Sequence, residues 1–262
     1  MLTLVLAAIF VGITIGMLGS GGSAITVPLL VYLVGHDPKI AITESMAIVG
    51  LISFFAAIPY ATSRRVDWHS VFYFGIPGVI GTYLGAVLGG IASGSMQLAV
   101  LGGVLVLAAV LMIRKAFFQN HSSDTAVAES SAEKGPTQSL WKIVLEGLVV
   151  GVLTGFVGVG GGFLIVPALV LLARLPIHTA IGTSLVIIAA KSVAGLIKYQ
   201  QILIDQGMSI DIQTIILFAL VGTAASHVGA AVNTKLDQQR LKQVFAVFLV
   251  FIGLFVIVRE TL

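Results

Sequence analysis

The sequence predicts an all-α protein that crosses a membrane several times and consists of two related halves. Of its 262 residues, 58% are hydrophobic and 10% are charged, and the mean hydropathy is +1.09. Soluble domains carry about 25% charged residues. Apolar runs such as 98–113 and 244–258 contain no charge, and a glycine-rich motif occurs twice. The chain therefore lacks the polar surface that water requires, and a lipid bilayer is the solvent that suits it.

The duplicated motif organises the chain. Residues 16–28 read GMLGSGGSAITVP and residues 155–167 read GFVGVGGGFLIVP, an offset of 139 residues. Further matches continue at this offset: Ala41, Ile42, Ser45 and Tyr60 meet Ala180, Ile181, Ser184 and Tyr199. An ordered series of this kind indicates internal duplication. We expect a first transmembrane repeat at 1–115 and a second at 140–262, joined by a flexible polar linker at 116–139 that is too poor in apolar residues to order itself.

Each half should contain one broken helix pair and three full spans. The apolar segments are 2–18, 23–35, 39–60, 70–92 and 96–114 in the first half, and 141–157, 162–174, 178–200, 211–232 and 241–258 in the second. A full span needs about 20 residues. Segments 23–35 and 162–174 are shorter and directly follow the glycines, so 2–35 and 141–174 each read as a helix, a break and a half-helix. Whether such a pair enters and leaves by one face, or crosses twice, stays open.

The charges predict inverted repeats. Basic pairs at 64–65 and 114–115 are separated by two full spans, and Lys and Arg in short loops mark the cytoplasmic side. In the second half the basic residues precede the last span: Lys235, Arg240 and Lys242. The loop 201–210 then lies outside, the linker lies in the cytoplasm and the C-terminus lies outside. The loops are assigned to the same sides of the membrane whether the broken pair enters and leaves by one face or crosses twice.

The glycine breaks are the first candidate site. A half-helix that starts inside the membrane presents free amides and about half a positive charge. Two such ends meeting near the midplane would bind an anion without any charged side chain, and paired breaks are typical of transporter sites. The residues expected to bind are Gly19, Ser20, Gly21, Gly22 and Ser23 in the first break and Gly158, Gly160, Gly161 and Gly162 in the second. The alternative is that these glycines only permit close helix packing.

Four side chains join this list. Lys191 lies near the middle of its span, where a cation is a functional candidate, unless its long stem carries the amine to an interface. Its counterpart is Ile52, so the feature is asymmetric. Glu44, opposite Thr183, could take up a coupling proton, neutralise Lys191 or serve only as an interfacial residue. Ser45 and Ser184 repeat and could line the site, although serines in membrane helices often serve packing.

Enzyme and metal functions find little support. The chain has no cysteine, no H-E-x-x-H, no acidic cluster and no phosphate loop. The glycine-flanked Ser20 resembles the nucleophile of an intramembrane serine hydrolase, with His227 as a conceivable base. Its counterpart is Val159, however, so the feature common to both halves is glycine and not a nucleophile. The hydrolase remains a remote alternative, and no cofactor is expected.

With its doubled G-x-x-G-x-G-G-[GS]-x-x-x-V-P motif, the chain resembles the sulfite exporter TauE/SafE family of membrane transporters. The resemblance covers both halves and implies transport of sulfur-containing anions such as sulfite and organosulfonates, commonly outward. It extends residue by residue only to the motif glycines and to Pro28 and Pro167. Ser23 stands where many motif copies have glycine.

We therefore expect a multi-pass transporter of the cell membrane that exports a small anion, sulfite or an organosulfonate, by alternating access at the paired breaks. A passive anion channel on the same scaffold is the alternative. The partners expected are the anion and the lipid bilayer, with no nucleic acid. Proton coupling and a homo-oligomer are further options that the sequence leaves open. The sequence leaves open which anion is carried, in which direction, with which coupling ion and in what oligomeric state.

Overall fold

The structure is a computed structural model and describes residues 1–19, 22–118, 140–171, 175–233, 247 and 250–259. Ser20, Gly21, most of the expected linker and the basic cluster before the last span lie outside these residues. The first half contains α1 (Leu2–Leu18), α2 (Ser23–Leu29), η1 (Leu30–Val34), α3 (Pro38–Thr62), α4 (Trp68–Ser70), η2 (Val71–Gly75), α5 (Ile76–Ile91) and α6 (Gly94–Phe118). The second half contains α7 (Leu140–Val157), α8 (Gly162–Leu171), α9 (Ile177–Asp205), α10 (Ile212–Asn233) and a last helix, Val250–Arg259. All regular secondary structure in the described part of the chain is helical, as the sequence predicted.

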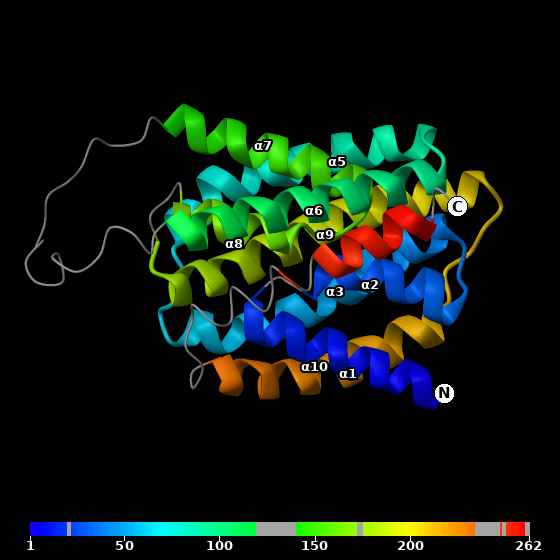
Figure 1. Ribbon diagram of the computed structural model, residues 1–262, viewed down its shortest axis with the longest axis horizontal. Helices are drawn as coiled ribbons and strands as arrows, with labels where there is room; N and C mark the ends of the chain where they lie inside the picture. Colours follow the sequence, from blue (N-terminus) through cyan, green and yellow to red (C-terminus); the bar gives the residue numbers. More distant parts are fainter. Residues whose placement is uncertain (20–21, 119–139, 172–174, 234–246, 248–249, 260–262) are drawn as a thin grey trace, which may run out of the picture.

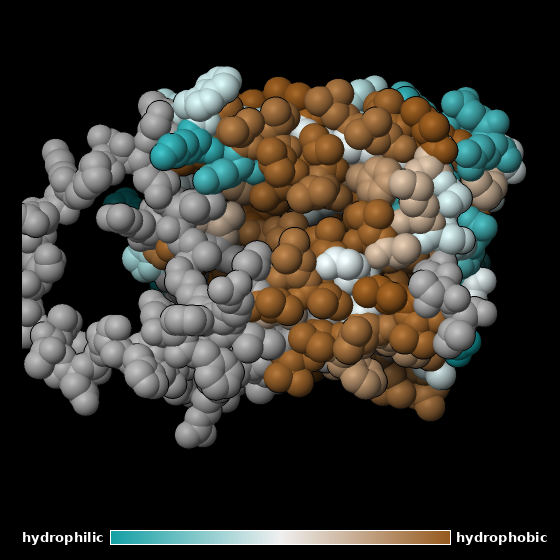
Figure 2. Space-filling model, turned by 45° about the horizontal axis from the view of Figure 1, so that its top comes forward, coloured by the Kyte–Doolittle hydropathy of each residue, from teal (hydrophilic) through white to brown (hydrophobic). Residues whose placement is uncertain are grey.

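Four helical stretches of the described chain are long and apolar enough to cross a membrane: Pro38–Thr62, Trp68–Ile91, His178–Asp205 and Ile212–Val232. The most buried of them lie in α3 and α9, which pack against each other at the centre. Helices α5 and α10 expose more of their apolar side chains. Figure 2 shows a broad hydrophobic belt with hydrophilic residues gathered toward the ends. This distribution fits a protein whose middle faces lipid.

Both predicted helix breaks are present. Helix α1 ends at Leu18 and α7 ends at Val157, and each is followed by a glycine in the left-handed conformation, Gly19 at φ +67° and Gly158 at φ +72°. Glycine adopts this conformation without the steric cost of a Cβ, which is why it commonly terminates helices. The chain resumes as α2 and α8 only a few residues later.

The first broken pair is a hairpin. From its start at Met1, α1 runs into the bundle, and α2 with η1 returns toward the same end (Figure 1). A methyl group on Gly22 would lie 2.6 Å from the carbonyl oxygen of Val11, so the returning chain runs back along α1. The π-helical η1 follows Pro28, which lacks an N–H for the regular helical ladder.

Equivalent helices of the two halves run in opposite directions. Gly195 of α9 packs on Met46 of α3, and Ser192 packs on Gly50, so residue numbers rise in one helix as they fall in the other. In Figure 1, α1, α3 and α6 run one way, and their counterparts α7, α9 and the last helix run the other way.

The first helix of each half packs against a helix of the other half. Helix α1 packs along α10 of the second half, and α7 packs along α5 of the first half. Glycines bring the backbones close: a methyl group on Gly12 would lie 2.2 Å from the carbonyl oxygen of Gly222, and one on Gly151 would lie 2.4 Å from that of Gly78. The first helix of each half is therefore held by the other half.

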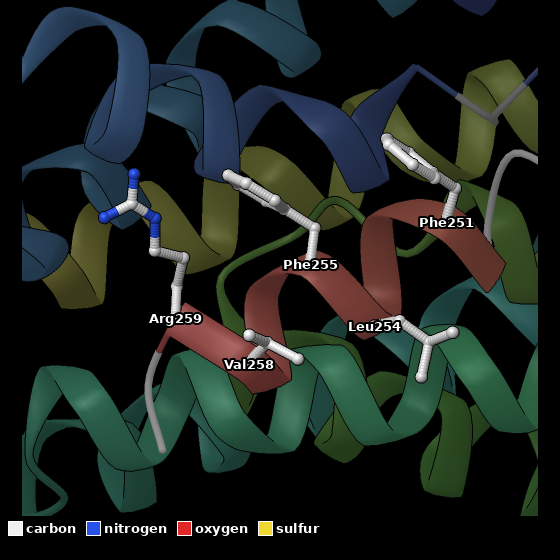
Figure 3. A pocket seen from close by; sticks show the side chains of 5 residues that line it. All are labelled: Phe251, Leu254, Phe255, Val258 and Arg259. Carbon is white, nitrogen blue, oxygen red and sulfur yellow. The ribbon is translucent and has the colours of Figure 1, made fainter. Parts of the chain in front are cut away.

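The last helix borders an open apolar groove. Figure 3 shows its lining by Phe251, Leu254, Phe255, Val258 and Arg259. Tyr32 packs edge-on against Phe255 with ring centroids 5.4 Å apart. Four of these five side chains are apolar and lie on the exposed face, so the groove resembles a lipid-facing surface more than a site for a polar solute.

The close backbone contact between α5 and α7 predicts the effect of a single methyl group. Gly151→Ala should destabilise the protein by about 1–3 kcal/mol, because the added carbon overlaps the Gly78 carbonyl and the two helices must separate. The measurement is the unfolding midpoint of the purified protein in detergent.

Gly103→Ala is the matched control, since no atom lies within 4 Å of the position that its Cβ would take. Helix propensity alone favours alanine over glycine by about 1 kcal/mol. Equal midpoints for the two variants would contradict the tight α5–α7 contact.

Candidate functional site

The second break places several backbone amides in the protein interior. The N–H groups of Gly158 and Val159 donate to Gly155 and Thr154, and those of Leu164 and Ile165 both donate to the carbonyl of Gly161. The amides of Gly160, Gly161 and Gly162 make no hydrogen bond to the described part of the chain. All three glycines are buried. The start of α8 thus offers the backbone donors that the sequence predicted for this break.

Lys191 lies beside this break and is completely buried. Its Nζ donates to Thr154 Oγ1 at 2.9 Å. Thr154 Oγ1 in turn lies 2.7 Å from the position that a Cβ on Gly161 would take. The amine therefore stays inside the protein next to the glycines, and the alternative of an amine reaching the interface is not what the structure shows.

Lys191 has no acidic partner among the described residues. The Glu44 carboxylate instead lies 2.6 Å from His36 Nδ1. The expectation that Glu44 could neutralise Lys191 is therefore not met in this structure. A buried ammonium that lacks a carboxylate partner carries a desolvation penalty of several kcal/mol. Such a group would be stabilised by an anionic ligand.

Two further serines lie in the central helices, Ser53 in α3 and Ser192 in α9, and the sequence reading missed them. Ser53 and Ser192 are buried, and their hydroxyl groups have no hydrogen-bond partner among the described residues. Ser192 Oγ lies 3.1 Å from the position that a Cβ on Gly160 would take. The signal was available, because Ser53 and Ser192 are separated by the repeat offset of 139 residues.

The first break lacks the lysine. Ile15 and Ile52 stand at the positions that correspond to Thr154 and Lys191. Both isoleucines are buried in one hydrophobic cluster. A hydroxyl still lies beside Gly22, that of Thr14, and it donates to the backbone carbonyls of Phe10 and Val11 in its own helix. The two breaks therefore share a backbone shape but differ in chemistry, because only the second has a buried amine.

Ser45 and Ser184 each connect one half to the break of the other half. Ser45 Oγ donates to the carbonyl oxygen of Gly158 at 2.7 Å, and Ser184 Oγ lies 3.1 Å from that of Gly19. Each also lies within 2.9 Å of a carbonyl one turn back in its own helix. The predicted pair thus reaches the glycines, but in this structure it satisfies the carbonyls at the end of each interrupted helix.

The other residues of the predicted site lie around the same helices. Gly19 packs on Ile181 of α9, as Gly158 packs on Ile42 of α3. Gly22 and Ser23 are buried at the start of α2, and α2 contacts α8. The described residues of both breaks therefore lie against the central α3–α9 pair.

Glu44 lies in α3 between Ile42 and Ser45, which contact Gly158, but its own side chain has other partners. It is fully buried, and both of its carboxylate oxygens have partners: Oε2 is 2.6 Å from His36 Nδ1, and Oε1 accepts the Asp211 N–H at 2.8 Å.

Comparison with known proteins identifies the family of the chain. The sequence profile described as "Sulfite exporter TauE/SafE" matches residues 4–256. A probable membrane transporter protein of Xylella fastidiosa strain 9a5c is 30% identical over 95% of this chain and 92% of its own length.

More distant relatives have the same description. The probable membrane transporter proteins MJ0441 of Methanocaldococcus jannaschii and YunE of Bacillus subtilis are 25% and 26% identical, each over 95% of this chain and 94% of its own length. No solved structure matches the chain. The profile covers both halves and both glycine breaks, and the chain therefore belongs to the TauE/SafE family of membrane transporters, which is not an enzyme family.

Proposed function

We propose that this protein is a secondary transporter that exports a small anion, sulfite or an organosulfonate, and that the anion binds at the second helix break. The observation that carries the proposal is Lys191, a buried amine beside three interior glycine amides and without an acidic partner in the described chain. The sulfur chemistry of the substrate comes from the family name alone.

The free-energy cost of placing Lys191 inside the membrane supports a functional role for this residue. A lysine at the centre of a membrane helix costs about 2.5–3.5 kcal/mol on insertion scales. One N–H of its ammonium group donates to Thr154, which leaves two N–H donors for a ligand. Ser192 and the amides of Gly160, Gly161 and Gly162 add neutral donors nearby. A donor set of this kind favours an oxyanion.

The difference between the two breaks supports an off-centre site. Ile15 and Ile52 occupy the first-half positions of Thr154 and Lys191, so the strongest donors for an anion come from the second half. We place the charged group of the substrate there, with Ser192 as an additional donor. The first break, from Gly19 to Ser23, supplies the opposite wall.

The arrangement of the halves supports alternating access. Equivalent central helices run in opposite directions, and each first helix is held by the other half. Such inverted repeats allow one site to be exposed first to one side and then to the other. We propose that the end near the linker is cytoplasmic, following the positive-inside rule, and that both chain termini lie outside.

Replacing the polar pair by its first-half counterparts tests the binding site. The double variant Lys191→Ile with Thr154→Ile should fold, because the same two side chains pack in the first half. It should weaken anion binding by about 10–100-fold, since a hydrogen bond to a charged group contributes about 1.5–3 kcal/mol. The measurement is the thermal shift of purified protein against sulfite, sulfate, thiosulfate, sulfonates and carboxylates.

Lys198→Met provides the charge-matched control. Lys198 lies 5.9 Å from the ring centroid of Tyr83, toward the far end of α9, and its removal should leave the anion response unchanged. If the double variant Lys191→Ile with Thr154→Ile kept the full anion-induced thermal shift, the proposed binding site would be disproved.

Transport in proteoliposomes separates a transporter from a channel. With a proton gradient across the vesicle membrane, a proton-coupled transporter should accumulate radiolabelled sulfite above its equilibrium ratio, and an ionophore that collapses the gradient should abolish this accumulation. A channel on the same scaffold would equilibrate the anion without ever exceeding that ratio. Uptake that only follows the anion's own electrochemical gradient would therefore contradict secondary transport.

A further inference from the structure

Two hydrogen bonds at opposite ends of the central helix pair are equivalent under exchange of the halves. At one end the Asp67 N–H donates to Thr183 Oγ1 of α9 at 2.9 Å. At the other end the Asp211 N–H donates to Glu44 Oε1 of α3 at 2.8 Å. Glu44 and Thr183 are separated by the repeat offset of 139 residues. Each bond ties a long central helix of one half to the loop before α4 or α10 in the other half.

The two donors are also alike. Asp67 precedes α4 and its carboxylate accepts the N–H of Ser70. Asp211 precedes α10 and its carboxylate accepts the N–H groups of Gln213 and Thr214. Each bond therefore links the start of one helix to the interior of another. Because α3 and α9 are antiparallel, the two bonds close opposite ends of the bundle (Figure 1).

The two acceptors differ in chemistry. Thr183 does not titrate. Glu44 does, and its second oxygen lies 2.6 Å from Nδ1 of His36 in the loop between η1 and α3. Glu44 is fully buried, whereas the His36 side chain is 20% exposed. Protons from solvent can therefore reach one bond of this pair through His36, while the other bond is built only from uncharged groups.

Few charged groups surround Glu44. The charged groups of the described chain that act on Glu44 are His36 and Asp211. A hydrogen bond from the Thr214 hydroxyl lowers the pKa of Asp211, so its carboxylate stays ionised. Nearby, Asp37 accepts the N–H of Lys39, and the Lys39 amine donates to the carbonyls of Gly89 and Gly90.

We propose that His36 and Glu44 form a proton-binding site that controls the opening of the bundle at the end of Asp211, while the end of Asp67 opens independently of pH. This proposal goes beyond anion binding and needs no substrate for its test. The ligand of the site is the hydrogen ion.

The direction of the effect follows from the hydrogen bonds. Histidine is the side chain that gains a proton between pH 8 and pH 5. When His36 gains it, the contact with the Glu44 carboxylate becomes charge-assisted, and such bonds are about twice as strong as neutral ones. Glu44 Oε1 also continues to accept the Asp211 N–H. Mild acidification therefore holds this end closed, and a proton must leave His36 before it opens freely.

Hydrogen exchange in the full-length protein measures this directly. In detergent and without added anion, lowering the pH from 8 to 6 should increase the protection of the Asp211 amide about tenfold after division by the intrinsic exchange rate, since each 1.4 kcal/mol is a factor of ten. The Asp67 amide should show no such change and serves as the internal reference.

Two variants make the test specific. His36→Asn retains a donor toward Glu44 but does not titrate, and Glu44→Thr copies the residue at the other end. Both should fold and both should flatten the pH dependence at Asp211. The proposal would be overturned if the protection of the wild-type Asp211 amide, relative to that of Asp67, did not change with pH. It would also be overturned if the pH dependence persisted in His36→Asn. Neither result bears on the thermal shift that anions cause through Lys191. A failure of the proposed anion site would therefore be seen in that separate measurement.

Discussion

The structure depends on satisfying the backbone where a helix stops inside an apolar interior. Ending α1 at Leu18 and α7 at Val157 frees carbonyl groups that lipid could not serve. The hydroxyl of Ser184 reaches the Gly19 carbonyl, and that of Ser45 reaches the Gly158 carbonyl. Each break thus receives a hydrogen bond from the opposite half. The mutual packing of α1 on α10 and α7 on α5 extends the same dependence along the bundle.

Within this shared frame the halves carry different chemistry. A buried amine and a hydroxyl face the second break, and isoleucines take their places at the first. At the ends of the central helices, a glutamate bonded to histidine stands opposite a threonine. A transporter built from inverted repeats needs the frame to be alike in both halves, so that two similar conformations exist. The side chains can differ between the halves without disturbing this frame.

Much of the fold could be predicted because its signals are local. Apolar segments such as 39–60 and 178–200 became α3 and α9, and the glycine runs marked both breaks. The site was only partly accessible. Lys191 stood out as a cation in an apolar run, and the serine pair Ser53 and Ser192 could have been found from the repeat offset. The partners of Glu44, His36 and the Asp211 amide, could not, since Asp211 is 167 residues away. Hydropathy records which residues avoid water and carries no information about such distant contacts.

The sequence by itself determined the class of the protein, its duplication and the position of both breaks, because composition, periodicity and glycine content act through the local backbone and through the solvent. Only the tertiary structure decided that Lys191 bonds Thr154 and not Glu44, and that Ser45 and Ser184 serve the break of the opposite half. These pairings depend on how helices from different halves cross, and a crossing is set by the close approach of glycines on both partners at once.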